Sequence, residues 1–195
     1  MNIEPAFFCP IATDNLNLDN TAIKNYCLNL KNQEPGRVKS NRGGWQSEDV
    51  SGYIPELNQM FIEILDRANK LHETMGYKSD RNQNFRNAWI NINGAGSFNL
   101  PHSHPEAIFS GVYYVDCKPN SGDIVFMNPQ AYFLNDNLIE KFTPFLSCTR
   151  SYQPEVGKLL LFPSWLSHYV ESNLSSEDRI SISFNTYIEK PVVVA

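Results

Sequence analysis

Short apolar runs separated by turns fill the chain from Phe85 onward, and they limit the choice of fold more than any other feature. Each run has the length and the β-branched or aromatic content of a strand. The runs are FRNAWININ, AIFSGVYYVD, GDIVFM, KLLLFPSW and RISISFNTYI. A succession of such segments predicts a mainly β protein, built as a sandwich or barrel.

The first eighty residues have a helical pattern instead. In DNTAIKNYCLNLK the apolar side chains recur at helical spacing behind plausible N-caps, and a longer apolar stripe runs from Leu57 to Met75, where Gly76 can end it. We expect residues 1–80 to be mainly helical support for a β core at 85–190, within a single domain spanning 1–195. His72, beside the stripe, is expected at a surface or boundary.

Composition limits the partners and the cellular compartment that we expect for the protein. The net charge of −5 and the lack of a Lys/Arg-rich stripe argue against a nucleic-acid partner. The four cysteines are scattered without a C-x-x-C pair, which indicates thiols in a reducing compartment. Without a signal-like start or a membrane-length apolar run, we expect a cytoplasmic protein with no membrane partner. A homodimer would be its commonest form of assembly.

Two histidines stand one residue apart in PHSHPEAIFSGVYYV, just ahead of a predicted strand. In an extended chain this spacing sends His102 and His104 to the same face, so both could bind one metal ion. His168 follows the apolar run KLLLFPSW and a turn. Three of the four histidines are therefore candidates for a metal site.

The run RISISFNTY alternates polar and apolar residues. Arg179, Ser181, Ser183 and Asn185 share one face of the predicted strand, opposite a fully apolar face. Polar strand residues usually face solvent, but these could also line the mouth of a barrel with Arg179 at its base. There the planar guanidinium could bind a carboxylate through two hydrogen bonds.

The order of His-x-His, a distal histidine and Arg-x-Ser resembles the signature of iron(II)/2-oxoglutarate oxygenases. The chain is similar to the small 2OG-Fe(II) oxygenase family of marine bacteria and their phages, and the similarity covers nearly its whole length. The matching segments are FFCPIATDNL, SNRGGWQS, HSHPEAIFSGVYYV, SGDIVF, GKLLLFPSWLSH and RISISFN. The resemblance implies a double-stranded β-helix (jelly roll) with N-terminal helices, in the host cytoplasm if a phage encodes it.

The same resemblance implies roles for individual residues. His102 and His168 would bind iron(II), and Arg179 would bind the far carboxylate of 2-oxoglutarate. The residues implied around the co-substrate or in the same cavity are Ser181, Ser183, Tyr114, Asn91 and Trp89. Trp89 would face the primary substrate.

Position 104 departs from the wider superfamily, which has a carboxylate there. Three interpretations stay open. In the leading one, His102, His104 and His168 form a three-histidine metal site. In the second, Glu106 supplies the carboxylate beside His104 and His168; in the third, water fills the position next to His102 and His168.

Two tryptophans and one long connecting segment are further features that the sequence places near the candidate site. Trp45, in RGGWQS, is expected either to contact substrate from a lid or to plug the loop against the core. Trp165 is expected to pack beneath the turn that orients His168. Residues 127–145 are long for a plain connection and are expected to form part of the substrate rim.

These features together predict an iron(II)- and 2-oxoglutarate-dependent dioxygenase that uses O2, hydroxylates an unidentified substrate and releases succinate and CO2. One alternative is a cupin-like metal dioxygenase with three histidines that does not use 2-oxoglutarate. The other is a jelly-roll binding protein without catalytic activity.

Overall fold

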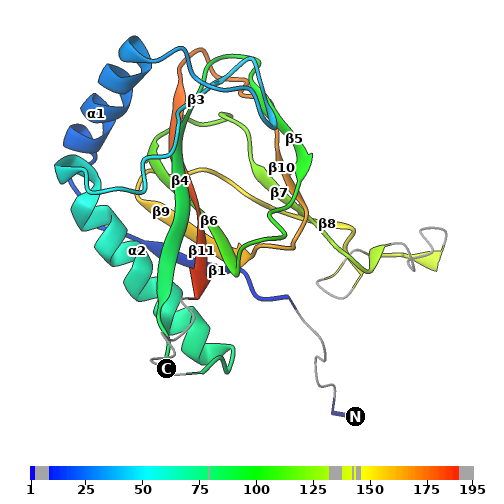
Figure 1. The fold of residues 1–195 in the computed structure, drawn as a ribbon. Coiled ribbons are helices and arrows are strands. Elements are labelled where there is room, and N and C mark those ends of the chain that lie inside the picture. Colours follow the sequence, from blue (N-terminus) through cyan, green and yellow to red (C-terminus); the bar gives the residue numbers. More distant parts are fainter. Residues whose placement is uncertain (3–8, 79, 132–137, 142, 144–145, 189–195) are drawn as a thin grey trace.

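The computed structural model contains two antiparallel β-sheets and two helices within the residues it describes, which are 1–2, 9–78, 80–131, 138–141, 143 and 146–188 (Figure 1). The two sheets lie face to face, and the helices lie along the outer side of one of them. The predicted mainly β architecture with supporting N-terminal helices is therefore confirmed.

The larger sheet has the strand order β1-β9-β6-β11-β4-β3. Its strands are β1 (Ala12–Asn15), β3 (Trp45–Gln46), β4 (Gln83–Asn93), β6 (Phe109–Asp116), β9 (Lys158–Pro163) and β11 (Arg179–Ile188). The two long strands β4 and β11 pair from Arg179 opposite Asn93 to Ile188 opposite Gln83. Neither is an edge strand, and their side chains reach both the core and the inside of the sandwich.

The smaller sheet has the strand order β2-β5-β10-β7-β8. Its strands are β2 (Asn41–Arg42), β5 (Phe98–His102), β7 (Ile124–Met127), β8 (Thr149–Tyr152) and β10 (His168–Val170). The central strand β10 pairs with β5 on one side and β7 on the other. This pairing places His168 directly opposite His102.

Both helices lie in the segments whose pattern predicts them. Helix α1 (Asn20–Gln33) is capped by Asp19, whose carboxylate accepts a hydrogen bond from the Thr21 N–H. Helix α2 (Pro55–Thr74) has proline in its first turn, and Gly76 follows its end with a φ of 79°. Their apolar faces join the core on the outer side of the larger sheet.

The apolar and polar side chains at the start of β11 lie on opposite faces of the strand, as predicted. Ile180, Ile182 and Phe184 are fully buried in the core cluster that includes the helices. Arg179 and Ser181 point to the opposite face, into the space between the two sheets. This period-two pattern is what places polar groups inside the sandwich.

Two features of the N-terminal half differ from the expectation. Strand β1, within the segment FFCPIATDNL, adds an edge to the larger sheet beside β9; Phe7 and Phe8 of that segment lie outside the described residues. His72 is buried, and its ring bonds to the carbonyl of Lys78 (2.9 Å) and to the Gln83 amide (3.0 Å). The expected surface position of His72 is therefore wrong, because its partner Gln83 comes from strand β4.

Gly111 makes close packing possible at the centre of the larger sheet. It lies opposite Phe184, and an added Cβ would stand 2.3 Å from the Cζ of that ring and 2.6 Å from the Leu160 carbonyl oxygen. Gly111→Ala is expected to lower the free energy of unfolding by about 1–3 kcal/mol through overpacking, measured by urea denaturation. Gly52→Ala is the matched control, because no atom lies within 4 Å of its added Cβ. Equal stability of the two variants would contradict this account of the packing.

Neither helix in the described part of the chain has both the length and the apolar character that crossing a bilayer requires.

Candidate functional site

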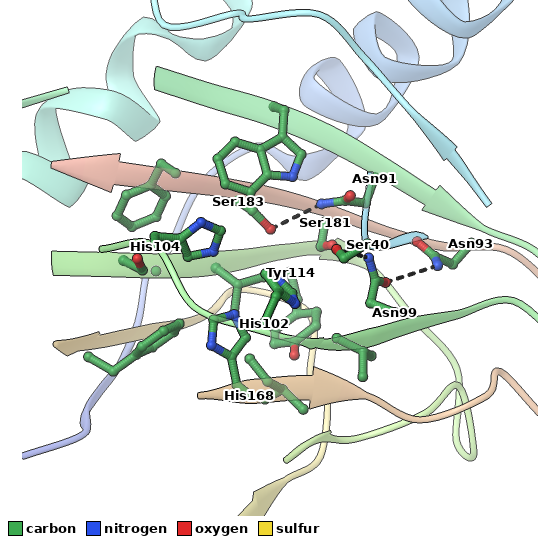
Figure 2. Close-up of a pocket in the computed structure, with 18 of the residues that line it drawn as sticks. Ser40, Asn91, Asn93, Asn99, His102, His104, Tyr114, His168, Ser181 and Ser183 are labelled. Atoms are coloured by element: carbon green, nitrogen blue, oxygen red, sulfur yellow. Dashed lines mark hydrogen bonds between the residues drawn. The ribbon is translucent and has the colours of Figure 1, made fainter. Parts of the chain in front are cut away.

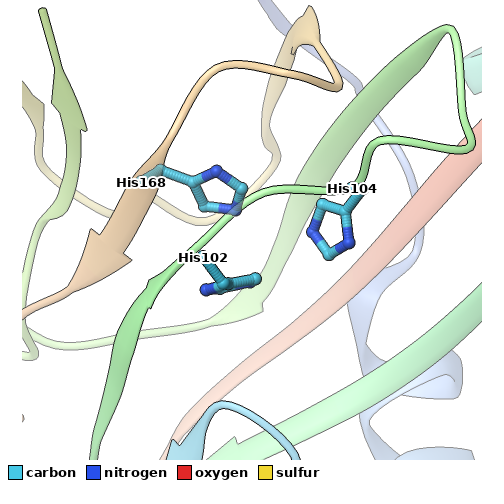
Figure 3. A group of neighbouring side chains, drawn as sticks. All are labelled: His102, His104 and His168. Atoms are coloured by element: carbon cyan, nitrogen blue, oxygen red, sulfur yellow. The ribbon is translucent and has the colours of Figure 1, made fainter. Parts of the chain in front are cut away.

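Three histidines gather between the sheets (Figure 3). His102 ends β5, His168 begins β10, and His104 follows two residues after the end of β5. Each histidine offers one ring nitrogen, and these three atoms lie within 4.8 Å of one another. Three nitrogens this close together could hold a single metal ion.

Backbone carbonyls fix the tautomers of two of these rings. The Nδ1 of His102 lies 2.7 Å from the Leu100 carbonyl oxygen, and the Nδ1 of His168 lies 2.9 Å from that of Leu166. A carbonyl can only accept, so each Nδ1 carries the proton and each Nε2 keeps its lone pair. Partners of this kind orient histidines that bind metals.

The environment keeps all three imidazoles neutral. Burial, with a smaller contribution from His102, lowers the pKa of His104 to about 4 and that of His168 to about 3. Burial also lowers the pKa of His102. Near pH 7 the cluster is therefore a set of neutral nitrogen donors, which suits iron, zinc, copper or nickel.

Glu106 stands apart from this cluster. Its carboxylate is mostly exposed and forms an ion pair with Arg86 on the surface. The group that the structure brings together is His102, His104 and His168, without a carboxylate from the described residues. This geometry favours the three-histidine interpretation over the shifted pair with Glu106.

A cavity, here called the inner cavity, extends from the histidines between the sheets (Figure 2). All the residues that the sequence associates with the co-substrate line it: Arg179, Ser181, Ser183, Tyr114, Asn91 and Trp89. Sequence reasoning missed four polar members of its wall, which are Ser40, Asn93, Asn99 and Ser110. Asn93 could have been found, because polar and apolar residues alternate in the run NAWININ just as they do in β11.

Hydrogen bonds order the polar wall of the inner cavity, as Figure 2 shows. Asn91 donates to the Ser183 hydroxyl at 3.0 Å, and Asn99 donates to the Ser40 hydroxyl at 3.2 Å. Tyr114 is buried opposite Ser181 in the sheet. Burial raises the pKa of Tyr114, so its phenol stays protonated and remains a hydrogen-bond donor.

Arg179 lines the inner cavity and is 2% exposed. Its Nη1 donates to the carbonyl oxygens of Ser121 and Gly122. No carboxylate of the described residues forms an ion pair with it, and no aspartate or glutamate lines the inner cavity. Burial lowers its pKa, but arginine stays charged. A buried cation without a carboxylate partner favours an anionic ligand.

The turn that holds Arg179 depends on glycine. Gly122 has a φ of 90°, and a Cβ there would lie 2.2 Å from the Glu171 carbonyl oxygen and 2.9 Å from the Arg179 Nη1. A side chain would therefore collide with the neighbouring strand and with the guanidinium itself.

Trp45 and Trp165 are not among the residues that line the inner cavity. Trp45 pairs with Ile92, packs against the helix-side core and donates from its indole to the Glu34 carbonyl at 3.0 Å. This placement favours the packing alternative, and a contact of Trp45 with substrate stays a prediction. Trp165 is 54% exposed, so it does not pack beneath the turn before His168.

The predicted substrate rim at 127–145 is described only in part. Residues 132–137, 142 and 144–145 lie outside the described residues. The contribution of this segment to a rim stays a prediction.

Comparisons with known proteins give a family and a set of similar folds. Residues 87–185 match the model of the family described as "Putative 2OG-Fe(II) oxygenase". A search of curated proteins found no match.

Among solved structures, a Pseudomonas putida prolyl-4-hydroxylase matches with a TM-score of 0.62 and 15% identity, over 92% of this chain and 93% of that one. The non-heme alpha ketoglutarate dependent carbocyclase SnoK from nogalamycin biosynthesis matches with a TM-score of 0.67 and 12% identity, over 92% and 79% of the two chains. HygX from Streptomyces hygroscopicus, with nickel, 2-oxoglutarate and hygromycin B bound, matches with a TM-score of 0.61 and 9% identity, over 91% and 82%. These likenesses confirm the double-stranded β-helix fold.

Proposed function

Since the chain belongs to the 2OG-Fe(II) oxygenase family, we propose that it is an iron(II)- and 2-oxoglutarate-dependent dioxygenase that hydroxylates its substrate and releases succinate and CO2. The observation that carries this proposal is Arg179, a buried cation without a carboxylate partner among the described residues. It shares one cavity with three neutral histidines. A 2-oxo acid needs a metal site and a group that binds its far carboxylate, and this one cavity has residues for both.

The three histidines would hold the metal, and Arg179 would hold the far carboxylate of 2-oxoglutarate. Iron(II), when bound, supplies the activation of O2 and the oxidation of the co-substrate and substrate. Neutral imidazoles are ready to bind without losing protons near pH 7. The Leu100 and Leu166 carbonyls keep the rings of His102 and His168 in the correct tautomer.

The remaining wall of the inner cavity would orient the co-substrate. The hydroxyls of Ser181 and Tyr114 lie on neighbouring strands beside Arg179 and can donate to carboxylate oxygens. Apolar residues such as Val112 and Phe162 line the same space and keep water away from it. Excluding water strengthens the attraction between the guanidinium and an anion.

A second candidate is a three-histidine dioxygenase that does not use 2-oxoglutarate. The cluster of His102, His104 and His168 favours it, since no carboxylate of the described residues joins them. This candidate gives no role to the buried Arg179, which is why we place it second.

An anaerobic titration of the metal-free protein with iron(II) and then 2-oxoglutarate, followed by visible absorbance, tests the proposal. We expect a weak charge-transfer band that saturates at one equivalent and appears only when both components are present. Iron binding without a response to 2-oxoglutarate would support the second candidate. If the protein bound no iron at all, both enzyme candidates would be wrong.

A further inference from the structure

A second cavity, here called the outer cavity, adjoins the histidine cluster. It shares Ser40, Trp89, His102 and His104 with the inner cavity, so the two spaces meet at the candidate metal site. The rest of its wall comes from residues between 37 and 49, from Asn87 and Ala88 of β4 and from Asn185 of β11. Arg179 lines only the inner of the two cavities, so a molecule in the outer cavity would reach the histidines from a space that Arg179 does not line.

The two acidic residues of this wall are already engaged. Glu48 forms an ion pair with Arg37 at 2.5 Å. Asp49 accepts hydrogen bonds from the backbone N–H groups of Ala88 (3.0 Å) and Ser51 (2.9 Å), and these bonds lower its pKa against the opposing effect of burial. Neither carboxylate is left to attract a cation.

The uncommitted groups of the wall are mainly hydrogen-bond donors. Lys39 has no ion pair within the described residues, and the side chain of Gln46 has no hydrogen bond there although it is only 8% exposed. The Gln46 amide is not among the fully buried polar atoms without a partner, so it remains accessible from the outer cavity and can donate to a ligand there.

A chain of hydrogen bonds adds another free donor. Ser110 donates to the Asn185 oxygen at 2.6 Å, and Asn185 donates to the Asn87 oxygen at 2.9 Å. Because each bond runs in the same direction, the chain ends on the Asn87 NH2 group, which lines the outer cavity. That end can give hydrogen bonds but has no acceptor among the described residues.

We infer that the outer cavity binds an oxyanion group of the primary substrate, a carboxylate, phosphate or sulfate, through Lys39, Gln46 and Asn87. The inference rests on the proposed function in taking the ligand to be the substrate. A substrate held in this way lies along the Trp89 ring, whose centroid is 5.7 Å from that of His104. Its anionic group binds away from the metal, and the rest of the molecule extends toward it.

The segment that carries Lys39 is firmly placed. The Arg37 N–H donates to the Gln46 carbonyl at 2.8 Å, and the Lys39 N–H donates to the Asn41 side chain at 2.7 Å. The Asn41 amide in turn donates to the carbonyls of Arg37 (3.0 Å) and Gly44 (2.8 Å). Lys39 therefore projects from a fixed turn, which lowers the entropy lost when it binds an anion.

The test uses the metal-free full chain labelled with ¹⁵N, so its outcome does not depend on iron binding. Inorganic phosphate and acetate are titrated separately against chloride at constant ionic strength, and the Trp89 indole signal is followed after its assignment with Trp89→Phe. We expect a saturable shift with at least one of the two anions. Lys39→Gln should weaken that binding about tenfold, the effect of losing a charged hydrogen bond.

Lys31→Gln is the matched control, because Lys31 lies outside the outer cavity and pairs with Asp178 at 3.5 Å. This variant should bind the anion as the unmodified chain does. The inference is wrong if neither anion shifts the Trp89 signal. It is also wrong if Lys39→Gln and Lys31→Gln bind equally well, since the anion would then bind elsewhere, for example at Arg179. A response to phosphate or to acetate supports the inference and indicates which class of anion to search first.

Discussion

His168→Ala is expected to lower the affinity of the protein for iron(II) by at least about 100-fold, because losing a ligand costs more than losing a residue that only supports one. His168 is buried at the start of β10, opposite His102, and no other histidine, cysteine or carboxylate of the described residues joins the cluster to replace it. The measurement is anaerobic competition for iron(II) against a coloured chelator.

Two further variants make this experiment decisive. Glu106→Ala should leave iron affinity unchanged, since its carboxylate pairs with Arg86 on the surface. His104→Ala separates the remaining interpretations: a large loss supports three histidine ligands, and an unchanged affinity supports water in the third position. Full iron binding by His168→Ala would refute the proposed metal site.

Arg179→Lys is expected to weaken 2-oxoglutarate binding about 100-fold while leaving iron affinity unchanged. Lysine keeps the positive charge but lacks the planar fork that binds a carboxylate through two hydrogen bonds at once. The measurement is the 2-oxoglutarate concentration that gives half of the charge-transfer absorbance in the iron-loaded protein.

Arg86→Lys is the control for this second variant, because it makes the same substitution at an exposed site. Arg179 also bonds to the carbonyls of Ser121 and Gly122, so iron affinity and thermal unfolding of the variant show whether the fold is kept. If the Arg179→Lys variant folds and its 2-oxoglutarate affinity is unchanged, then Arg179 does not bind the co-substrate.

The sequence predicts those parts of the fold and site that follow from local periodicity. In β11 the two-residue repeat alone separates Ile180 and Ile182 from Arg179 and Ser181, and the structure places these pairs on opposite faces. Helix α2 is equally local, since proline, an apolar stripe and glycine mark its extent.

Features that depend on distant partners were not predictable in this way. The side on which Trp45 packs is set by the pairing of β3 with β4, and a two-residue strand has no readable period. His72 is buried by its bond to Gln83. The outer cavity forms where residues between 37 and 49 lie beside β4 and β11, which are distant in the sequence. None of these contacts leaves a repeating pattern in the sequence.

The turn at residues 121–122, which holds Arg179, limits the substitutions that evolution can make at these two positions. Main-chain oxygens hold the guanidinium, and every amino acid carries the same main chain. Related chains could therefore replace Ser121 without moving the arginine, whereas position 122 admits glycine alone. A homologue that lost this glycine would be expected to have lost the orientation of its arginine, even with every histidine still in place.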